Sequence, residues 1–534
     1  MSQGSTQPLE SEEQTVPRSA FKVMVGGLFS LLAGLASQIV IAALFGAGVE
    51  MDAFLTALVV PIYLQAVLLS GLTFVLIPAF IQEETEGRTN DAWALTGTFF
   101  WLTAAILTVI TILVVVFSRT IIDLYAPGLN IFKAELAASM LVVIMLSLPL
   151  SGLGTLTAGI QNAQNKFFWP AIAAALGSLG NVLILLLLYS RIGAIALAWG
   201  FLASEIIKAC VTIFPTLRHG WKKVLPLNDI RIRMLGRLML PFLIFGILTR
   251  ATLIFERYFA SWLPDGDLSY LGYGSKITKI VLVLFGVSIA TAIFPAMARS
   301  YSQKGTPALV EKLEYGLRLS LVVGLPVVMI MAALSEPLVS VLFERGEFDK
   351  FTTLRVSRIV PIVLLGGVLL VMIHNITRRA YYTTKDTHTP PIIDAFASVF
   401  YLLIAGVFVR NWGYVGLAWV TPIYSGLDIL VLLIILARRL KTFPSKDLLR
   451  KTSFYLGASL IAFLAAWLSS RTLSSLSALP QLLICSAFSG AIYLFLLFRF
   501  DNEIALSVLE MTGVQKIITR AKGILQRNAE SIAR

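Results

Sequence analysis

The sequence has few charged residues and very little cysteine or histidine. Of its 534 residues, 14% are charged whereas 57% are hydrophobic, and the mean hydropathy is +0.83. A water-soluble domain cannot bury so large an apolar fraction, so the composition excludes a soluble globular protein. Cys210 and Cys485 are isolated residues in apolar runs. They predict neither a disulfide framework nor a cysteine-ligated metal.

Motifs for catalysis and for cofactors are missing as well. The three histidines, His219, His374 and His388, are scattered along the chain, and no HExxH, GxSxG or phosphate-loop pattern accompanies them. We therefore expect no catalytic residue, no metal and no cofactor. The protein is predicted not to be an enzyme.

Long apolar runs are what the sequence has in abundance. They recur from Phe21 to Phe500 at about 20 residues each, and they lack the alternation of barrel strands. This pattern predicts an all-α polytopic membrane protein with about 14 transmembrane helices. The first run, Phe21 to Gly48, is too long for a signal-peptide core, so we expect it to be retained as the first helix.

Lys and Arg residues indicate which loops are cytoplasmic. They cluster at 218–237, at 438–451 and in the C-terminal tail, which fits fourteen spans with both termini inside. The net charge of +13 then reflects topology, and we expect no nucleic acid partner. Residues 503–526 space apolar side chains as an amphipathic helix does, which indicates binding to the anionic inner leaflet or, alternatively, to a partner protein.

An internal repeat relates two halves of the chain. The stretch ending "GAIALAW" at Trp199 resembles the stretch ending "GYVGLAW" at Trp419, and Pro170 aligns with Pro390 in the same register, without a gap. Two parallel six-helix lobes would suit a transporter that works by alternating access. The predicted organisation is a polar cytoplasmic tail (1–20), an N-lobe (21–216), a basic cytoplasmic linker (217–234), a C-lobe (235–440), two extra helices (452–499) and an amphipathic basic tail (500–534).

Charged residues also occur inside the predicted spans. The seventh predicted span, at 235–263 and called helix 7, contains "RATLIFERYF" with Arg250, Glu256 and Arg257. The eighth, at 270–298 and called helix 8, contains Lys276 and Lys279. Snorkelling to the outer headgroups is one interpretation, but it suits Arg250 poorly because that residue starts about 20 Å from the outer end of its span. Because charges facing lipid are costly, we favour a wet cationic cavity that binds a diphosphate or a similar anionic headgroup.

Four further charged residues lie in apolar runs. Glu205 and Lys208 are three residues apart and are predicted to form a structural ion pair. Asp394 and Asp428 are interpreted as packing or hinge hydrogen bonders. Proton or sodium coupling at a carboxylate is the alternative.

Several stretches resemble the MurJ (MviN) family of the MOP flippase superfamily. They follow one another at the family's spacing: "LFGAGVEMDAFLTALVVP", "QNAQNKFFWPA", "FASWLPDGDLSYLGYGSKI", "FGVSIATAIFPAMARS", "LFERGEFD" and "RRAYYTTKDTHTPP". The resemblance implies a flippase in the bacterial cytoplasmic membrane. Its substrate would be a polyprenyl-diphosphate-linked oligosaccharide, typically the peptidoglycan precursor lipid II, carried between leaflets of the lipid bilayer. It also admits other cell-envelope synthesis proteins as partners.

The resemblance further implies which residues contact the substrate. Asp52 corresponds to the family's loop-start aspartate, and Lys276 to its helix 8 arginine. Where typical members have three arginines in helices 1 and 2, this sequence has Leu31, Ser37 and Gln65, and Gln38 replaces an acidic residue. The candidate substrate-binding residues are Arg250, Glu256, Arg257, Lys276, Lys279, Asp52, Gln38 and Gln65.

These departures leave the cargo open between three interpretations. The anion site has moved to helix 7, the ligand is a different lipid-linked glycan of the exopolysaccharide or O-antigen type, or the chain is a transport-inactive scaffold. Two other classes compete with a flippase. A multidrug exporter of the same superfamily would need an acidic cavity, and a membrane glycosyltransferase would need a large outer loop with catalytic residues.

Overall fold

The computed structural model describes residues 15–217, 224–226, 228–283 and 287–506. Within these ranges the regular structure is helical and contains no strand. The predicted amphipathic helix at 503–526 lies almost wholly outside the described residues, as does most of the N-terminal tail. The all-α fold class is confirmed for the part of the chain that the structure describes.

The helices of the first half follow the predicted apolar runs. They are α2 (Thr15–Phe45), α3 (Val49–Thr85), α4 (Thr89–Val116), α5 (Ser118–Tyr125), α6 (Ile131–Met145), α7 (Ser147–Ala163), α8 (Phe168–Ile192), α9 (Ile195–Leu217), α10 (Ile230–Arg250) and α11 (Thr252–Ala260).

The second half continues in the same way. Its helices are α12 (Asp267–Val281), α13 (Val287–Lys304), α14 (Thr306–Ala333), α15 (Ser335–Phe343), α16 (Lys350–Leu364), the π-helix η2 (Leu365–Leu370), α17 (Val371–Thr383), α18 (Thr389–Leu440), α19 (Lys446–Thr472) and α20 (Ala478–Phe500).

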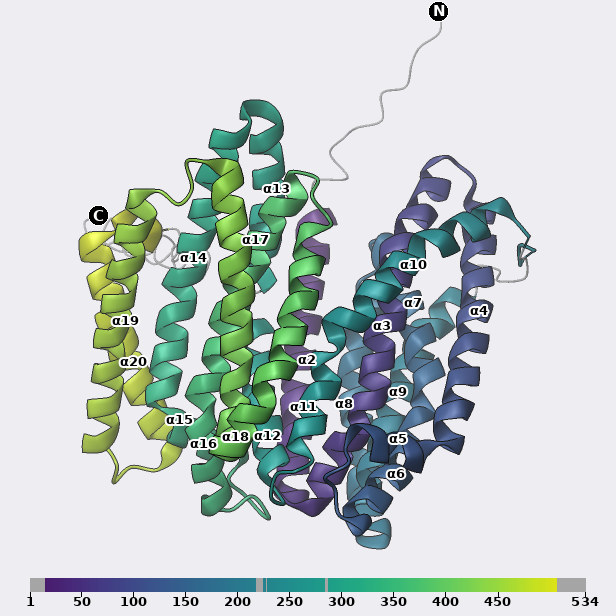
Figure 1. The fold of residues 1–534 in the computed structure, drawn as a ribbon, viewed down its shortest axis with the longest axis horizontal. Coiled ribbons are helices and arrows are strands. Elements are labelled where there is room, and N and C mark those ends of the chain that lie inside the picture. Colours follow the sequence, from purple (N-terminus) through teal and green to yellow (C-terminus); the bar gives the residue numbers. More distant parts are fainter. Residues whose placement is uncertain (1–14, 218–223, 227, 284–286, 507–534) are drawn as a thin grey trace, which may run out of the picture. The chain divides into compact units, whose positions relative to one another are not determined.

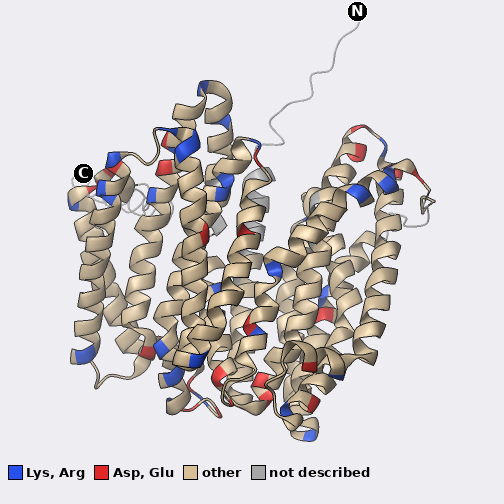
Figure 2. Cartoon of the chain, viewed as in Figure 1, with Lys and Arg blue, Asp and Glu red and all other residues tan. Residues whose placement is uncertain are grey.

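The count of fourteen spans is not confirmed. Among the described residues, ten helices are long and apolar enough to cross a membrane, or eleven if α6 and α7, which meet at 41°, form one bent span. Charged residues gather near the helix ends and are sparse along the middles, as Figure 2 shows. Both observations agree with helices surrounded by lipid.

The chain divides into two compact units. Unit 1 contains Met1–Gly272, Phe343–Thr352 and Ser398–Leu417, and unit 2 contains Tyr273–Leu342, Thr353–Ala397 and Ala418–Arg534. In unit 1, α8 packs against α2 and α9, and α3 packs against α6, α7 and α10. In unit 2, α14 lies beside α19 and α20 (Figure 1) and also packs against α13 and α17. The lobe boundaries expected from the repeat stay a prediction.

The internal repeat is visible in backbone conformation. Gly193 has φ 56° and ψ −134°, and Gly413, its counterpart in the repeat, has φ 56° and ψ −138°. Asn165 and Lys385 are another pair in the same register, and both have positive φ, 59° and 61°. Side-chain-bearing residues rarely adopt such angles, so chance agreement is a poor explanation.

A pair of hydrogen bonds repeats as well. Gln161 donates from Nε2 to the carbonyl of Thr212 at 2.6 Å, and the Tyr381 hydroxyl donates to the carbonyl of Leu432 at 2.6 Å. The two donors occupy equivalent positions of the repeat, and so do the two acceptors. The two halves therefore share local geometry as well as sequence pattern.

Candidate functional site

The charges of helix 7 lie on two helices that meet at Ala251. Arg250 ends α10, while Glu256 and Arg257 lie on α11. Ala251 retains right-handed helical angles, φ −58° and ψ −27°, and residues Ile230–Ala260 together qualify as one membrane span. The sequence therefore located the span correctly but did not predict the interruption.

Arg257 pairs with its neighbour Glu256. Its Nη1 lies 2.9 Å from Glu256 Oε1, and its side chain is 14% exposed. The Nε atom of Arg257 is buried and has no hydrogen-bond partner among the described residues. A buried donor of this kind is costly unless a ligand or water satisfies it. Glu256 thus offsets the charge of Arg257, and the guanidinium keeps an unpaired Nε donor among the described residues.

Arg250 has a different environment. Its side chain is exposed, and it makes no hydrogen bond or ion pair with any residue in the described ranges. Seven residues separate it from Arg257, which corresponds to roughly 10 Å along a helix. An unpaired guanidinium at this depth in a membrane span costs about 2.5–3.5 kcal/mol if it faces lipid. Arg250 is therefore available to pair with an anionic ligand.

Helix α3 is the neighbour of α10 in unit 1. The Tyr63 hydroxyl donates to the carbonyl of Ile247 at 3.3 Å, three residues before Arg250. Gln65 follows Tyr63 by two residues and is half-buried, with no hydrogen bond recorded among the described residues. On α2, the Oε1 atom of Gln38 is buried and likewise lacks a partner there.

At the other two positions where arginines were expected, one side chain is apolar and the other is already hydrogen-bonded. Leu31 is half-buried, and the hydroxyl of Ser37, which is 2% exposed, accepts a 3.3 Å hydrogen bond from Asn181 Nδ2. Neither side chain offers a cation. Within unit 1, Arg250 on α10 and Arg257 on α11 bring positive charge beside α3, whereas Lys133 on α6, also beside α3, is paired with Asp52 and Asp265.

Lys276 and Lys279 lie on α12 in unit 2. The Nζ atom of Lys276 sits 4.5 Å from the centroid of the Tyr273 ring, a cation–π contact. Lys279 is exposed and has no recorded partner among the described residues. Their expected sharing of one cavity with Arg257 stays a prediction.

Asp52 is the most fully bonded of the candidate residues. Its Oδ1 accepts from the amide and hydroxyl of Ser269 at 2.8 and 2.6 Å, and its Oδ2 accepts from the amide of Gly266 at 2.8 Å. Lys133 Nζ lies 3.2 Å from Oδ2, and both side chains are almost completely buried. Asp52 thus holds the start of α12 within unit 1, and its contact with substrate stays a prediction.

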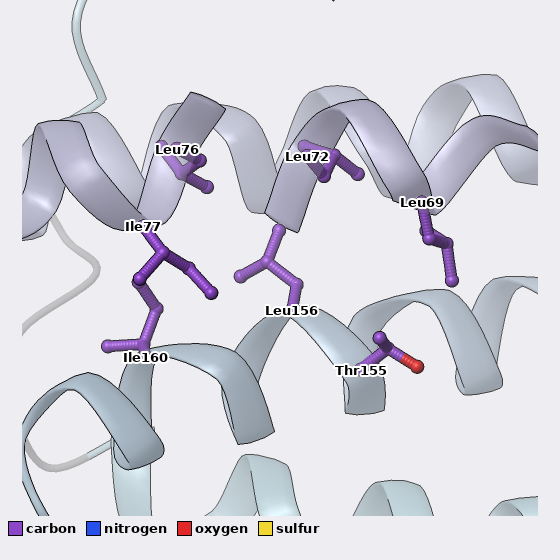
Figure 3. A pocket seen from close by; sticks show the side chains of 7 residues that line it. All are labelled: Leu69, Leu72, Leu76, Ile77, Thr155, Leu156 and Ile160. Carbon is purple, nitrogen blue, oxygen red and sulfur yellow. The ribbon is translucent and has the colours of Figure 1, made fainter. Parts of the chain in front are cut away.

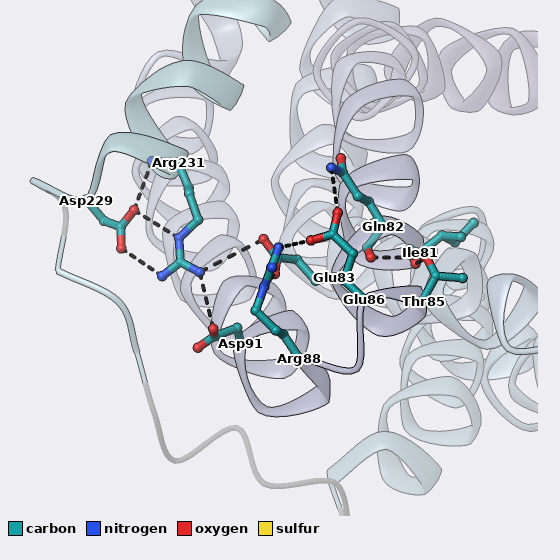
Figure 4. A network of polar contacts seen from close by, with 9 residues as sticks. All are labelled: Ile81, Gln82, Glu83, Thr85, Glu86, Arg88, Asp91, Asp229 and Arg231. Carbon is teal, nitrogen blue, oxygen red and sulfur yellow. Dashed lines mark hydrogen bonds and ion pairs between the residues drawn. The ribbon is translucent and has the colours of Figure 1, made fainter.

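A second network of polar contacts, drawn in Figure 4, joins residues 81–91, at the end of α3 and the start of α4, to residues 229–231, at the start of α10. Arg231 bonds bidentately to Asp229 at 3.2 and 3.0 Å and reaches Asp91 at 3.6 Å. Hydrogen bonding from Arg231 lowers the pKa of Asp229. Asp229 also caps α10 by accepting from the amide of Arg231 at 2.8 Å. The network fixes where α10 begins relative to α3 and α4.

A gap between α3 and α7 is apolar and does not match the expected anion site. It is lined by Leu69, Leu72, Leu76, Ile77, Thr155, Leu156 and Ile160 (Figure 3). A charged headgroup would lose its hydration there without gaining a partner. This gap is therefore not a candidate for the diphosphate.

Two other predictions concern charges in the spans. Lys208 Nζ lies 2.8 Å from Glu205 Oε1, so the predicted structural pair is confirmed. Asp394 and Asp428, interpreted separately from the sequence, both approach His374 in unit 2. Sequence reasoning missed this cluster because its members come from three distant stretches with no shared spacing.

Comparison with known proteins identifies the family. The family model described as lipid II flippase MurJ matches residues 41–485. The chain belongs to the MurJ family. As expected for this family, it is a multi-pass protein of the bacterial cytoplasmic membrane.

Individual relatives agree with this assignment. A probable lipid II flippase MurJ of Vibrio cholerae is 27% identical over 441 residues, covering 78% of this chain and 82% of the relative. A lipid II flippase MurJ of Burkholderia cenocepacia is 24% identical over 446 residues, covering 81% and 86%.

Solved structures show the same fold. The inward closed conformation of a lipid II flippase MurJ has a TM-score of 0.77 at 22% identity, covering 90% of this chain and 99% of that one. An inward-facing multidrug transporter of the MATE family, also of the MOP superfamily, has a TM-score of 0.64 at 17% identity, covering 78% and 96%. The MurJ-family chain described here therefore has the MOP superfamily fold.

Proposed function

We propose that this protein flips lipid II, an undecaprenyl-diphosphate-linked glycan, from the inner to the outer leaflet of the cytoplasmic membrane by alternating access. The observation that carries the proposal is the match to the lipid II flippase family over residues 41–485. No bond is made or broken in this process, which agrees with a chain that carries no recognisable catalytic motif.

Arg250 and Arg257 are the residues we assign to the diphosphate. A guanidinium binds phosphate oxygens with two parallel hydrogen bonds, and Arg250 lacks any other partner among the described residues. Arg257 offers its buried Nε donor in addition. Gln65 and Gln38 would contribute neutral hydrogen bonds where relatives are expected to use charge, and Lys276 and Lys279 would add positive charge.

Orientation and partners complete the proposal. Both termini are assigned to the cytoplasm because the basic stretches at 218–237 and 438–451 then face inward. Enzymes that make the lipid-linked precursor and polymerise it outside are the partners that this direction of flipping requires.

Depletion followed by lipid analysis tests the cargo. We expect loss of the protein to cause lipid II to accumulate in the inner leaflet, measured by extraction of polyprenyl-linked sugars and mass spectrometry. Accumulation of a different polyprenyl-linked glycan would refute the assignment to lipid II while leaving the family membership intact.

Complementation tests the anion site. We expect Arg250→Ala and Arg257→Ala to abolish growth of the depleted strain at normal membrane levels, and Arg250→Lys to retain part of the activity because it keeps a point charge. Arg191→Ala is the matched control, since Arg191 is an exposed arginine in the last turn of α8. Full growth with both alanine variants would rule out this anion site.

A further inference from the structure

One backbone carbonyl lies at the interruption between α10 and α11. The amide of Ala251 donates to the carbonyl of Leu248 at 3.3 Å, a spacing of three residues. In a regular α-helix that amide bonds to the carbonyl four residues earlier, which belongs to Ile247. The interruption therefore takes away the donor that the carbonyl of Ile247 has in a continuous helix.

A tyrosine of the neighbouring helix supplies a donor to this carbonyl. The Tyr63 hydroxyl on α3 donates to the carbonyl oxygen of Ile247 at 3.3 Å. Helices α3 and α10 belong to unit 1 and pack side by side (Figure 1). Because residues Ile230–Ala260 qualify as one membrane span, a carbonyl that is open there cannot rely on bulk water, and leaving it unsatisfied is costly. The hydroxyl thus takes over the role of the Ala251 amide.

The fold does not require an interruption at this place. Helix α2, which corresponds to α10 in the first half of the repeat, runs unbroken through the equivalent position. In the same register, Tyr63 and Ile247 correspond to Val283 and Trp467. Valine has no hydroxyl, and α19, which contains Trp467, is also unbroken. The break in α10 therefore occurs where a hydroxyl compensates for it, and equivalent helices without such a donor are continuous.

Arg250 lies on the stripe of α10 that faces α3. Ile232 and Arg250 are eighteen residues apart, which is five full turns, and Met239 lies within about 20° of both on the helical wheel. Ile232 is buried, and Met239 contacts α3, since a Cβ added to Gly71 would lie 3.5 Å from it. Arg250 is the exposed member of this stripe, so its backbone does not point away from unit 1.

The geometry of the break decides where the guanidinium of Arg250 lies. Arg250 is the last residue of α10 and follows the bonded carbonyl of Ile247 by three residues, about 4.5 Å along the helix axis. A guanidinium that binds phosphate oxygens with two parallel hydrogen bonds tolerates little displacement. If the amide of Ala251 bonded to Ile247 instead, the last turn of α10 would rewind and Arg250 would move with it.

We propose that Tyr63 is a positioning residue for the anion site. Its hydroxyl holds the break between α10 and α11 open, and the break places the Arg250 guanidinium for the diphosphate of the substrate. The contribution to diphosphate binding rests on the proposed function, whereas the control of the break by Tyr63 does not.

Spin-label distances test the control of the break. Leu240 on α10 and Tyr258 on α11 are exposed, so cysteines at these two positions can carry nitroxides in a Cys210→Ser and Cys485→Ala background. We expect Tyr63→Phe, measured on the full-length protein in nanodiscs by double electron–electron resonance, to shift the distance between the labels because the Ile247 carbonyl regains the Ala251 amide. Tyr63→Leu is a second variant that also lacks the hydroxyl.

Ligand binding tests the effect on the anion site. The probes are farnesyl diphosphate and farnesol, which differ by the diphosphate. We expect Tyr63→Phe to weaken binding of farnesyl diphosphate by about 5-fold or more and to leave binding of farnesol unchanged. In an Arg250→Ala background the same change should have no further effect, because Tyr63 acts through Arg250.

A second tyrosine of unit 1 provides the matched control. Tyr189 on α8 is 37% exposed, and its hydroxyl has no recorded hydrogen bond among the described residues. Tyr189→Phe should therefore keep the wild-type label distance and the wild-type affinity for both probes.

Three results would overturn the role of Tyr63. One is a label distance that stays the same in both Tyr63 variants. Another is an equal loss of affinity for farnesol and farnesyl diphosphate, which would indicate general damage to the fold. The third is a further loss of farnesyl diphosphate binding when Tyr63→Phe is added to Arg250→Ala. Wild-type affinity in Arg250→Ala alone would instead refute the proposed anion site and leave the spin-label result standing.

Discussion

Replacing Asp52 with asparagine should destabilise unit 1 strongly. The variant keeps the shape of the side chain but removes its charge and turns one acceptor into a donor. Oδ2 accepts from the amide of Gly266 at 2.8 Å and faces Lys133 Nζ at 3.2 Å, while Oδ1 accepts twice from Ser269. An NH₂ group at the position of Oδ2 would meet an amide and an ammonium, both of which are donors.

The size of the effect follows from burial and from the remaining partners. Removing one member of a buried ion pair costs about 3–5 kcal/mol. Lys133 retains Asp265 at 2.5 Å, but that carboxylate is half exposed, with 52% of its side chain accessible. We therefore expect about 3–4 kcal/mol for Asp52→Asn. Lys133→Met should cost less, about 1–3 kcal/mol, because Asp52 then keeps three hydrogen bonds to α12 and the loop before it.

Thermal stability in detergent, followed by fluorescence-detected size-exclusion chromatography, measures the difference. A cost of this size lowers the apparent melting temperature by on the order of 10 °C. Asp123→Asn is the matched control, because Asp123 forms an exposed ion pair with Arg119 in the same unit and should contribute under about 1 kcal/mol. Equal shifts for Asp52→Asn and Asp123→Asn would refute the reasoning.

Two further predictions concern the repeat and the loop before α18. Gly193→Ala and Gly413→Ala should each destabilise by about 1–3 kcal/mol through backbone strain alone, since φ is 56° at both and no atom lies within 4 Å of an added Cβ; unequal melting temperatures would show that the two bends are not equivalent. Burial opposes ionisation of Asp386, but hydrogen bonds from Thr389 and the guanidinium of Arg439 outweigh it and lower its pKa. This carboxylate therefore stabilises the protein above its ordinary pKa of about 4 and loses the contribution as pH falls below that value. Melting temperatures measured from pH 6 to pH 3 should fall more steeply for wild type than for Asp386→Asn, and parallel curves would contradict the assignment.

The sequence predicted the fold well because apolar run length has a direct physical cause. A span must satisfy its backbone hydrogen bonds internally, so each long run becomes a helix. Interruptions differ in how far they could be predicted. The bend between α6 and α7 has a local signal, because Pro149 in the first turn of α7 cannot donate a hydrogen bond to the carbonyl of Met145. The break at Ala251 has no proline or glycine at the junction, and Ala251 keeps helical angles. Packing against neighbouring helices sets this second break, and no local pattern encodes it.

The candidate site was predictable to a lesser degree. Arg250 stood out because a central charge in an apolar run is rare, and the structure leaves it without a partner among the described residues. Asp52 could not be assigned its bonds from sequence, because its partners are far away along the chain, at Gly266 and Ser269. His374 was interpreted as non-catalytic because no motif accompanies it, and the carboxylates that face it come from other stretches of the chain.

The repeat explains why the two halves of the chain can take different roles. Gly193 and Gly413 share one backbone conformation, so the scaffold on which side chains are placed is duplicated. The polar side chains on this scaffold are not duplicated. The positions of Asp394 and Asp428 in unit 2 correspond to Ala174 and Lys208 in unit 1. A duplicated scaffold constrains packing in both copies but leaves buried charge free to diverge. Charge that differs between otherwise equivalent helices is therefore where the two copies can acquire different roles.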